Sequence, residues 1–193
     1  MPAVRFCSAC GAALPSAPPV RCEACGARHW LNPKPCANAI VVDGGRILLG
    51  RRAHEPWLGR FGSPGGFCEL GEHPIETVVR EAREETGYAV EVRAYLGTWV
   101  DVYADDPSER DAVVINVAYY LATPLAREPG SADPHEVSEL AWFAWDEVPR
   151  ELAPPGTLEA VLEAARSALA RPLPELLDAP PRSSTSPART RRR

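Results

Sequence analysis

The stretch GFCELGEHPIETVVREAREETGY, which runs from Gly66 to Tyr88, determines the fold and the site that this sequence predicts. Pro74 suits the first position of a helix, where its missing N–H costs nothing. Gly87 suits the residue just past the helix end, where a left-handed backbone conformation is needed. We therefore expect a helix over residues 74–86. The apolar stripe that should pack this helix on a sheet consists of Ile75, Val78, Val79 and Ala82.

Three carboxylates share one face of the expected helix. Glu81, Glu84 and Glu85 stand at positions i, i+3 and i+4, so they project into one sector of roughly 100°. At ~5 Å and an effective dielectric constant near 20, each pair costs on the order of 3 kcal/mol. One interpretation is a solvated acidic face with Arg80 and Arg83 as salt-bridge partners. The other is a site for a hard divalent cation, which prefers oxygen ligands and relieves the repulsion.

The spacing favours the cation site. With Gly66, Glu72, Arg80 and the three glutamates at fixed offsets before Gly87, the stretch resembles the Nudix box, the signature of hydrolases that act on nucleoside diphosphates linked to another moiety. The two loosely hydrophobic positions of the box hold Ala82 and Tyr88. The resemblance implies an enzyme that binds Mg²⁺ or Mn²⁺ through Glu81, Glu84 and Glu85. Arg80 would orient a carboxylate beside it; a surface ion pair is the alternative.

The expected chemistry is hydrolysis of a pyrophosphate bridge. A divalent cation neutralises the charge of the bridge, polarises phosphorus and lowers the pKa of a bound water. A further carboxylate would take the proton of the attacking water. The resemblance places this group in the loop before the last strand, residues 132–139. Glu136 is the first candidate for an extra metal ligand or base and Glu139 the second, although either could be a solvated loop carboxylate.

Substrate-binding candidates flank the box. Gly65 and Gly66 allow the backbone to come close to metal and phosphate, unless they only form a tight turn. Phe67 and Tyr103, like Trp57 and Trp99, could stack on an adenine or nicotinamide ring or simply pack.

A pair of arginines ends a predicted strand. Alternation puts Arg51 and Arg52 on opposite faces, so at most one meets phosphate, and Arg51 is taken as the candidate.

Two C-x-x-C-G motifs lie near the amino terminus. Their four cysteines suit tetrahedral zinc in a small ribbon, and two disulfides are the alternative in an oxidising compartment. The four ligands leave no open position, so the zinc would be structural. The first residues lack the apolar region of a signal peptide and no run approaches ~18 apolar residues, so we expect a cytoplasmic protein without a membrane span. The ligand candidates are Cys7, Cys10, Cys22 and Cys25.

The remaining patterns predict the architecture. Apolar runs over 39–42 and 47–49 flank Asp43-Gly44-Gly45 as a hairpin. Further strands are expected within 88–102, 113–122 and 139–145, a short helical turn at 146–149 and a helix over 157–170. This pattern favours an α/β fold, an α/β/α sandwich with a mixed sheet, which the resemblance also implies. We expect a zinc ribbon at 1–34, a Nudix hydrolase domain at 36–172 and a disordered Pro/Ser/Arg tail at 173–193.

The net charge of the chain bears on which molecules it could bind. The net charge is −5, and without the last twelve residues, which hold five arginines, the chain has 16 basic and 26 acidic residues. An acidic body argues against broad nucleic-acid binding, although the tail could touch nucleic acid. The resemblance suggests a homodimer.

Three functions stay open. The first is metal-dependent hydrolysis of a small nucleotide such as ADP-ribose, NAD(H) or FAD. The second is removal of nucleotide caps from RNA 5′ ends. The third is a non-catalytic nucleotide-sensing module, against which the complete carboxylate set argues. The stretch from Ala94 to Tyr103 lacks the motif that NADH pyrophosphatases carry after the box, which puts NADH preference in doubt.

Overall fold

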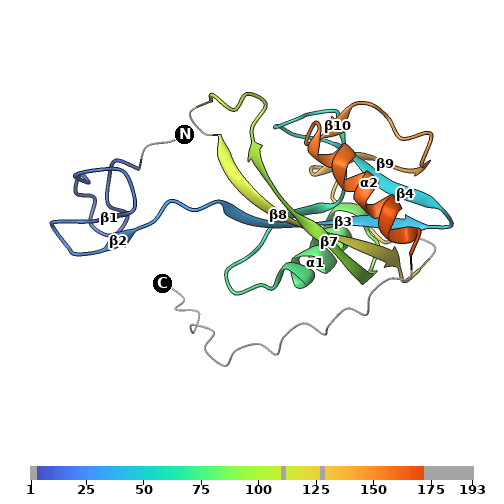
Figure 1. Ribbon diagram of the computed structural model, residues 1–193, viewed down its shortest axis with the longest axis horizontal. Coiled ribbons are helices and arrows are strands. Elements are labelled where there is room, and N and C mark those ends of the chain that lie inside the picture. Colours follow the sequence, from blue (N-terminus) through green and yellow to red (C-terminus); the bar gives the residue numbers. More distant parts are fainter. Residues whose placement is uncertain (1–3, 110–111, 127–128, 172–193) are drawn as a thin grey trace.

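The computed structural model describes residues 4–109, 112–126 and 129–171. The predicted tail at 173–193 lies outside these residues. Figure 1 shows a small amino-terminal ribbon at one end of the molecule and a larger sheet with helices at the other. The ribbon contains β1 (Val20–Arg21) and β2 (Arg28–His29), which pair antiparallel.

The large sheet is mixed and has eight strands. Its strand order is β10-β5-β4-β3-β8-β7, with β6 paired to β3 and β9 paired to β4. The pairs β3–β8 and β5–β10 are parallel, and the other pairs are antiparallel. The strands are β3 (Lys34–Asp43), β4 (Arg46–Arg52), β5 (Phe61–Gly62), β6 (Gly65–Phe67), β7 (Val90–Tyr103), β8 (Val113–Pro124), β9 (Val137–Ala144) and β10 (Leu152–Ala153).

One helix covers each face of this sheet. Alternate residues of β3 point to opposite sides, so Ile40 belongs to one core cluster and Val41 to the other. Helix α2 (Thr157–Leu169) joins the Ile40 cluster, and helix α1 (Pro74–Thr86) joins the Val41 cluster. The predicted α/β/α sandwich with a mixed sheet is confirmed.

Helix α1 has the predicted bounds and two defined ends. His73 caps it by accepting a hydrogen bond from the Ile75 N–H, and the Glu76 side chain accepts one from the His73 N–H at 3.0 Å, which makes a capping box. Gly87 has φ 73° and donates to the Arg83 carbonyl, which ends the helix in the left-handed conformation.

Two details of the expected elements were wrong. Val79 is 39% exposed, because it lies one residue beyond the stripe that Val78 and Ala82 form, and Thr77 and Thr86 are buried instead. Both threonine hydroxyls are satisfied locally, by the Glu72 carboxylate and the Ala82 carbonyl. The expected helical turn at 146–149 is a plain turn, which the Glu147 N–H closes on the Ala144 carbonyl.

Within the described part of the chain, no helix is both long and apolar enough to cross a membrane.

Candidate active site

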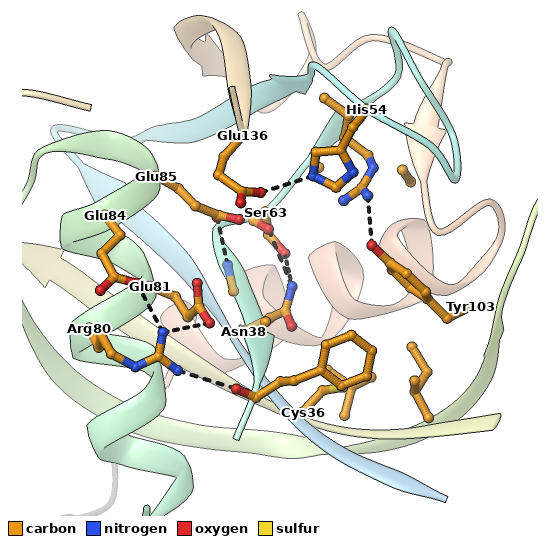
Figure 2. Close-up of a pocket in the computed structure, with 18 of the residues that line it drawn as sticks. Cys36, Asn38, His54, Ser63, Arg80, Glu81, Glu84, Glu85, Tyr103 and Glu136 are labelled. Carbon is orange, nitrogen blue, oxygen red and sulfur yellow. Dashed lines mark hydrogen bonds and ion pairs between the residues drawn. The ribbon is translucent and has the colours of Figure 1, made fainter. Parts of the chain in front are cut away.

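A cavity of about 790 Å³ opens between α1, β6 and the first half of β3. Figure 2 shows that its walls also come from the end of β7 and from two loops that carry His54 and Glu136. The cavity gathers the predicted carboxylates Glu81, Glu84 and Glu85 with Glu136, and we call these four residues the acidic wall.

Arg80 organises the carboxylates of α1. Its guanidinium donates to both oxygens of Glu72, at 2.8 and 3.0 Å, and also to Glu81 at 2.8 Å and Glu84 at 2.9 Å. The Arg80 guanidinium lowers the pKa of Glu72 to about 2, so Glu72 stays ionised. The Glu72 carboxylate in turn raises the pKa of Arg80. Arg80 thus holds two cavity carboxylates in place, and Glu72 fixes Arg80.

The surroundings of Glu85 disfavour its charged form. It lies partly buried and accepts a hydrogen bond from the Gly65 N–H at 2.9 Å. Burial raises the pKa of Glu85 to about 8, with the neighbouring Glu81 and Glu136 carboxylates adding to the shift. Burial likewise raises the pKa of Glu81. This excess of negative charge on hard oxygen atoms suits a divalent cation.

Gly66 makes room for Glu81. A Cβ atom on Gly66 would overlap the Glu81 carboxylate. The glycine therefore lets β6 pass directly against the Glu81 carboxylate, in a space that a larger residue would occupy.

Glu136 reaches the cavity from the loop before β9, where the resemblance implied a further carboxylate. The ring nitrogen Nε2 of His54 lies 2.9 Å from its carboxylate, and Nδ1 of His54 lies 2.7 Å from the Glu55 carbonyl oxygen. His54 therefore fixes the orientation of Glu136. The second candidate, Glu139, does not line the cavity and pairs with Arg51 at 2.7 Å.

An aromatic wall faces the acidic one. Tyr103 meets the rings of Trp57 and Phe67 edge to face, each at 5.5 Å between centroids. The hydroxyl of Tyr103 accepts a hydrogen bond from Arg52 at 3.0 Å. Gly65, Gly66, Phe67 and Tyr103 all line the cavity as expected, and Trp57 joins them. Trp99 packs on Tyr119 instead and is not among the lining residues.

Of the two arginines that end β4, Arg52 lines the cavity and the expected Arg51 does not. Arg51 stacks over Phe61 at 4.3 Å, donates to the Gly59 carbonyl and pairs with Glu139. The alternation along β4 directs the two side chains to opposite faces, which the sequence indicated without deciding which face is the cavity.

Sequence reasoning missed Asn38, His54 and Ser63, which also line the cavity. The Asn38 amide donates to the Ser63 carbonyl at 3.2 Å and so ties β3 to the loop before β6. Only a three-dimensional arrangement brings these polar side chains together, since they stand in no local motif. Asn38 could have been noted as the one polar residue between positions 35 and 42 of β3, where all its neighbours are apolar.

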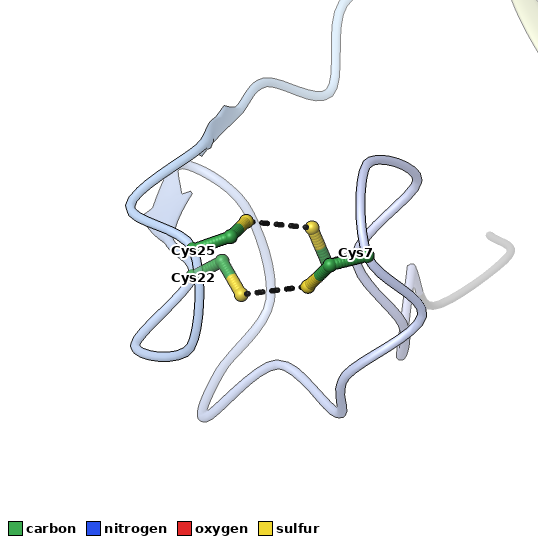
Figure 3. A group of neighbouring side chains, drawn as sticks. Cys7, Cys22 and Cys25 are labelled. Carbon is green, nitrogen blue, oxygen red and sulfur yellow. Dashed lines mark hydrogen bonds between the residues drawn. The ribbon is translucent and has the colours of Figure 1, made fainter.

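The ribbon holds a second candidate metal centre (Figure 3). The sulfur atoms of Cys7, Cys10, Cys22 and Cys25 all lie within 4.8 Å of one another, and all four cysteines are free. The Cys7–Cys25 and Cys10–Cys22 sulfur pairs are 3.6 and 3.7 Å apart. Tetrahedral zinc with Zn–S bonds of about 2.3 Å requires sulfur separations of about 3.8 Å, whereas a disulfide requires about 2.05 Å. The geometry therefore fits a four-thiolate metal site and does not fit two disulfides.

Comparison with known proteins gives the family. A protein-family model described as NUDIX domain matches residues 32–163, which is more than half of the chain. The ADP-ribose pyrophosphatase of Methanocaldococcus jannaschii is 37% identical over 49% of this chain and 53% of its own length. The NAD-capped RNA hydrolase NudC of Pectobacterium carotovorum is 28% identical over 80% of this chain and 56% of its own length. The chain thus spans about half or less of the curated relatives it matches.

Solved structures agree with this assignment. The crystal structure of a MutT NUDIX hydrolase from Burkholderia pseudomallei matches with a TM-score of 0.61 and 31% identity, covering 69% of this chain and 98% of that one. The fold, the box and the family match agree, and the chain belongs to the NUDIX domain family.

Proposed function

We propose that this protein hydrolyses the pyrophosphate bond of a nucleoside diphosphate linked to another moiety and that the reaction depends on Mg²⁺ or Mn²⁺. The observation that carries the proposal is the cavity that gathers Glu81, Glu84 and Glu85 from one helix with Glu136 from a separate loop. Relatives named ADP-ribose pyrophosphatase and NAD-capped RNA hydrolase support the substrate class.

Each residue of the acidic wall has a role in this proposal. Glu81, Glu84 and Glu85 would hold the cation, which when bound supplies charge neutralisation and an acidified water. Glu136 accepts the proton of the attacking water, in the orientation that His54 gives it. Arg80 positions Glu81 and Glu84.

The aromatic wall of the cavity supports this substrate class. Phe67 and Tyr103 offer rings to a nucleobase, and Gly65 and Gly66 let the diphosphate approach the backbone. ADP-ribose, NAD(H) and FAD all present a nucleobase, a diphosphate and a second group. Arg51 has no part in the proposed site, because it lies outside the cavity.

A substrate panel with product identification tests the function. ADP-ribose, NADH and FAD are incubated with Mg²⁺ or Mn²⁺, and the two monophosphate products are identified. We expect Glu85→Gln to lower kcat by at least 100-fold and Glu84→Gln to lower it less, while both variants keep the wild-type circular dichroism spectrum. Glu159→Gln on α2 is the matched control. Equal turnover in Glu85→Gln and wild type would refute the assignment of the site.

Removal of nucleotide caps from RNA is the second candidate. The similarity to the NAD-capped RNA hydrolase extends over 80% of this chain, more than the NUDIX match alone spans. The ribbon is also basic, with Arg5, Arg21, Arg28 and Lys34 against one acidic residue, Glu23. Deleting Arg182–Arg193 tests the tail: unchanged turnover of capped RNA would show that these arginines have no part in RNA binding. A nucleotide sensor is not favoured, because it needs no metal-binding carboxylates.

The remaining assignments are part of the same proposal. The four cysteines would bind one structural Zn²⁺, which the sulfur geometry supports and which metal analysis of the reduced protein tests. The resemblance to the family supports a homodimer, which sedimentation would detect. A cytoplasmic location agrees with four free cysteines, since a reducing compartment keeps thiols from forming disulfides.

A further inference from the structure

The C-x-x-C-G motifs of the ribbon form two knuckles, residues 7–11 and 22–26, which face each other across the sulfur pairs (Figure 3). Each knuckle is closed by a backbone hydrogen bond of 2.8 Å, from the N–H of its glycine to the carbonyl of its first cysteine. Those first cysteines, Cys7 and Cys22, are 2% and 1% exposed. The closing bonds lie within one knuckle, so they do not hold the two knuckles together.

The side chain of His29 joins the two knuckles. It belongs to β2, which follows the second knuckle, and its Nε2 lies 3.2 Å from the Cys7 sulfur of the first knuckle, 22 positions away. Among the residues that the structure describes, His29 is the only side chain other than a cysteine that forms a hydrogen bond with a sulfur of the four-cysteine set. The set whose ligand atoms all lie within 4.8 Å of one another contains the four cysteines and not His29. The imidazole therefore stands beside the thiolate site rather than within it.

The chemistry of a thiolate site decides which partner of this contact donates. A cysteine that binds a metal is deprotonated, so the Cys7 sulfur can then only accept a hydrogen bond and Nε2 must carry the proton. Four thiolates around one divalent ion leave an excess of negative charge on sulfur, which a hydrogen bond to sulfur relieves. Pairing of β2 with β1, where His29 lies opposite Val20, holds the half-buried ring in this position.

We propose that His29 is a positioning residue of the ribbon's metal site: its Nε2–H donates to the Cys7 thiolate and so holds the first knuckle in place against the second. The inference rests on the structural Zn²⁺ that we propose for the ribbon. Thiolates repel one another until a cation lies between them, so a contact that brings the knuckles together without the cation favours binding. Partners that form hydrogen bonds with metal ligands typically account for about 10–100-fold in metal affinity.

The affinity of the full chain for Zn²⁺, measured by competition with a chromophoric chelator, tests this role. Excess Mg²⁺, which prefers oxygen ligands, keeps the carboxylates of the cavity out of the measurement. We expect His29→Phe, which keeps a ring but cannot donate, to bind Zn²⁺ about 10-fold more weakly or worse. His29→Gln should recover most of this loss, because its amide N–H can take the place of Nε2–H. Unchanged affinity in His29→Phe would overturn the proposal.

The absorption spectrum of the Co²⁺-substituted protein gives a readout that mere packing of the His29 ring would not change. The energy of sulfur-to-metal charge transfer depends on the electron density of the sulfur, which a hydrogen bond lowers. The charge-transfer band should therefore move to longer wavelength in His29→Phe and keep its place in His29→Gln. Saturating Co²⁺ fills the site even in a variant that binds weakly. A band that moves in both variants, or in neither, would contradict the hydrogen bond.

Arg28→Gln is the matched control, at the residue before His29 in β2. It removes a positive charge from the ribbon, but Arg28 forms no hydrogen bond with a sulfur of the described ribbon. We expect an unchanged Co²⁺ band and a smaller loss of Zn²⁺ affinity than in His29→Phe. An equal loss in Arg28→Gln would mean that the charge of the ribbon, and not the hydrogen bond, sets the affinity.

The wild-type chain separates this inference from the proposed zinc site. If its cysteines bind neither Zn²⁺ nor Co²⁺, the zinc site itself is refuted. If wild type binds both metals and His29→Phe matches it in affinity and spectrum, the zinc site stands and only the role of His29 is refuted.

Discussion

Gly66 illustrates how a missing side chain can position a carboxylate. The glycine lies where β6 passes Glu81, and a methyl group there would overlap the Glu81 carboxylate. We expect Gly66→Ala to displace Glu81 and to lower kcat/KM by about 100-fold, because a displacement of about 1 Å in an active site has costs of this order. Steady-state kinetics with the best substrate of the panel measures the effect.

Gly62 provides the control for this prediction. A Cβ atom on Gly62 would meet nothing closer than 3.5 Å, which is ordinary van der Waals contact. Gly62→Ala should therefore cost much less activity than Gly66→Ala. Similar losses in both variants would show that the segment tolerates no side chain at all, and the argument from Glu81 would fail.

Glu85 should make the stability of the cation-free protein depend on pH. The folded-state pKa is about 8 against an ordinary value of 4.5, so the folded state resists ionisation. Below pH 4.5 the Glu85 carboxyl is protonated in both the folded and the unfolded state, so it has no effect on stability. As the pH rises from 4.5 towards 8, Glu85 ionises in the unfolded chain but stays protonated in the folded one. The free energy of unfolding therefore falls by about 1.36 kcal/mol per pH unit, up to a few kcal/mol in total. Glu85→Gln should thus be more stable than wild type at pH 8 and about equal to it near pH 4.5.

Urea unfolding without Mg²⁺ or Mn²⁺ measures this difference at both pH values. Adding Mn²⁺ at pH 8 should stabilise wild type far more than Glu85→Gln, because the cation removes the cost of the buried charge. An equal response of the two proteins would contradict the role of Glu85 in cation binding.

The sequence predicted the acidic wall better than the other side of the cavity. Glu81, Glu84 and Glu85 share one face because helical periodicity places them there, and periodicity is visible in a sequence. His54 and Arg52 could not be chosen in the same way. Which face of β4 meets the cavity depends on how the sheet packs, and His54 meets Glu136 across 82 positions of the chain.

Helix α1 shows that local chemistry can fix an element's ends. Gly87 has φ 73° and lies against the Gly130 backbone, which a Cβ atom on residue 87 would overlap. We expect Gly87→Ala to lower the free energy of unfolding by more than the roughly 1 kcal/mol that a left-handed alanine costs. Gly45→Ala, at φ 77° with nothing within 4 Å, should show only that smaller loss.

Chemical unfolding of the two variants separates conformational strain from contact. The difference between them reports the collision with Gly130. If both variants lose the same stability, the segment around Gly130 does not press on the end of α1.

Elements with strong local signals were predictable, and short ones were not. The hairpin of β3 and β4 and both helices follow from turn residues and periodicity. Strands β5 and β10 have two residues each and pair with one another in parallel across the chain, so they exist only because tertiary packing aligns them. The same dependence explains Val79: the width of the apolar stripe on α1 is set by the sheet beneath it.

At the scale of the whole molecule, the ribbon and the sheet are separate in space (Figure 1). A ribbon of this size buries little apolar surface, so the Zn²⁺ that we propose for it would supply most of its folding free energy, about 10–16 kcal/mol in comparable peptides. We expect removal of zinc to unfold the ribbon and leave the NUDIX domain folded. Hydrogen exchange should lose protection at 4–33, while the main melting transition shifts by no more than ~2 °C.

Cys22→Ser tests the same point without a chelator that could also take the catalytic cation. It should lack zinc, and its ribbon should exchange as the zinc-free wild type does. A single shared loss of protection across ribbon and sheet would instead mean that the two fold as one unit.

The linker between the ribbon and the large sheet is short. Strand β2 ends at His29 and β3 begins at Lys34, a span of at most ~17 Å even when fully extended. Two residues later Cys36 already lines the cavity. If the ribbon binds part of a ligand, as the second candidate function requires, that ligand would be tethered near the cavity, and tethers of this length give effective concentrations in the millimolar range. The ribbon would then raise occupancy of the cavity through proximity, without contacting the reacting groups.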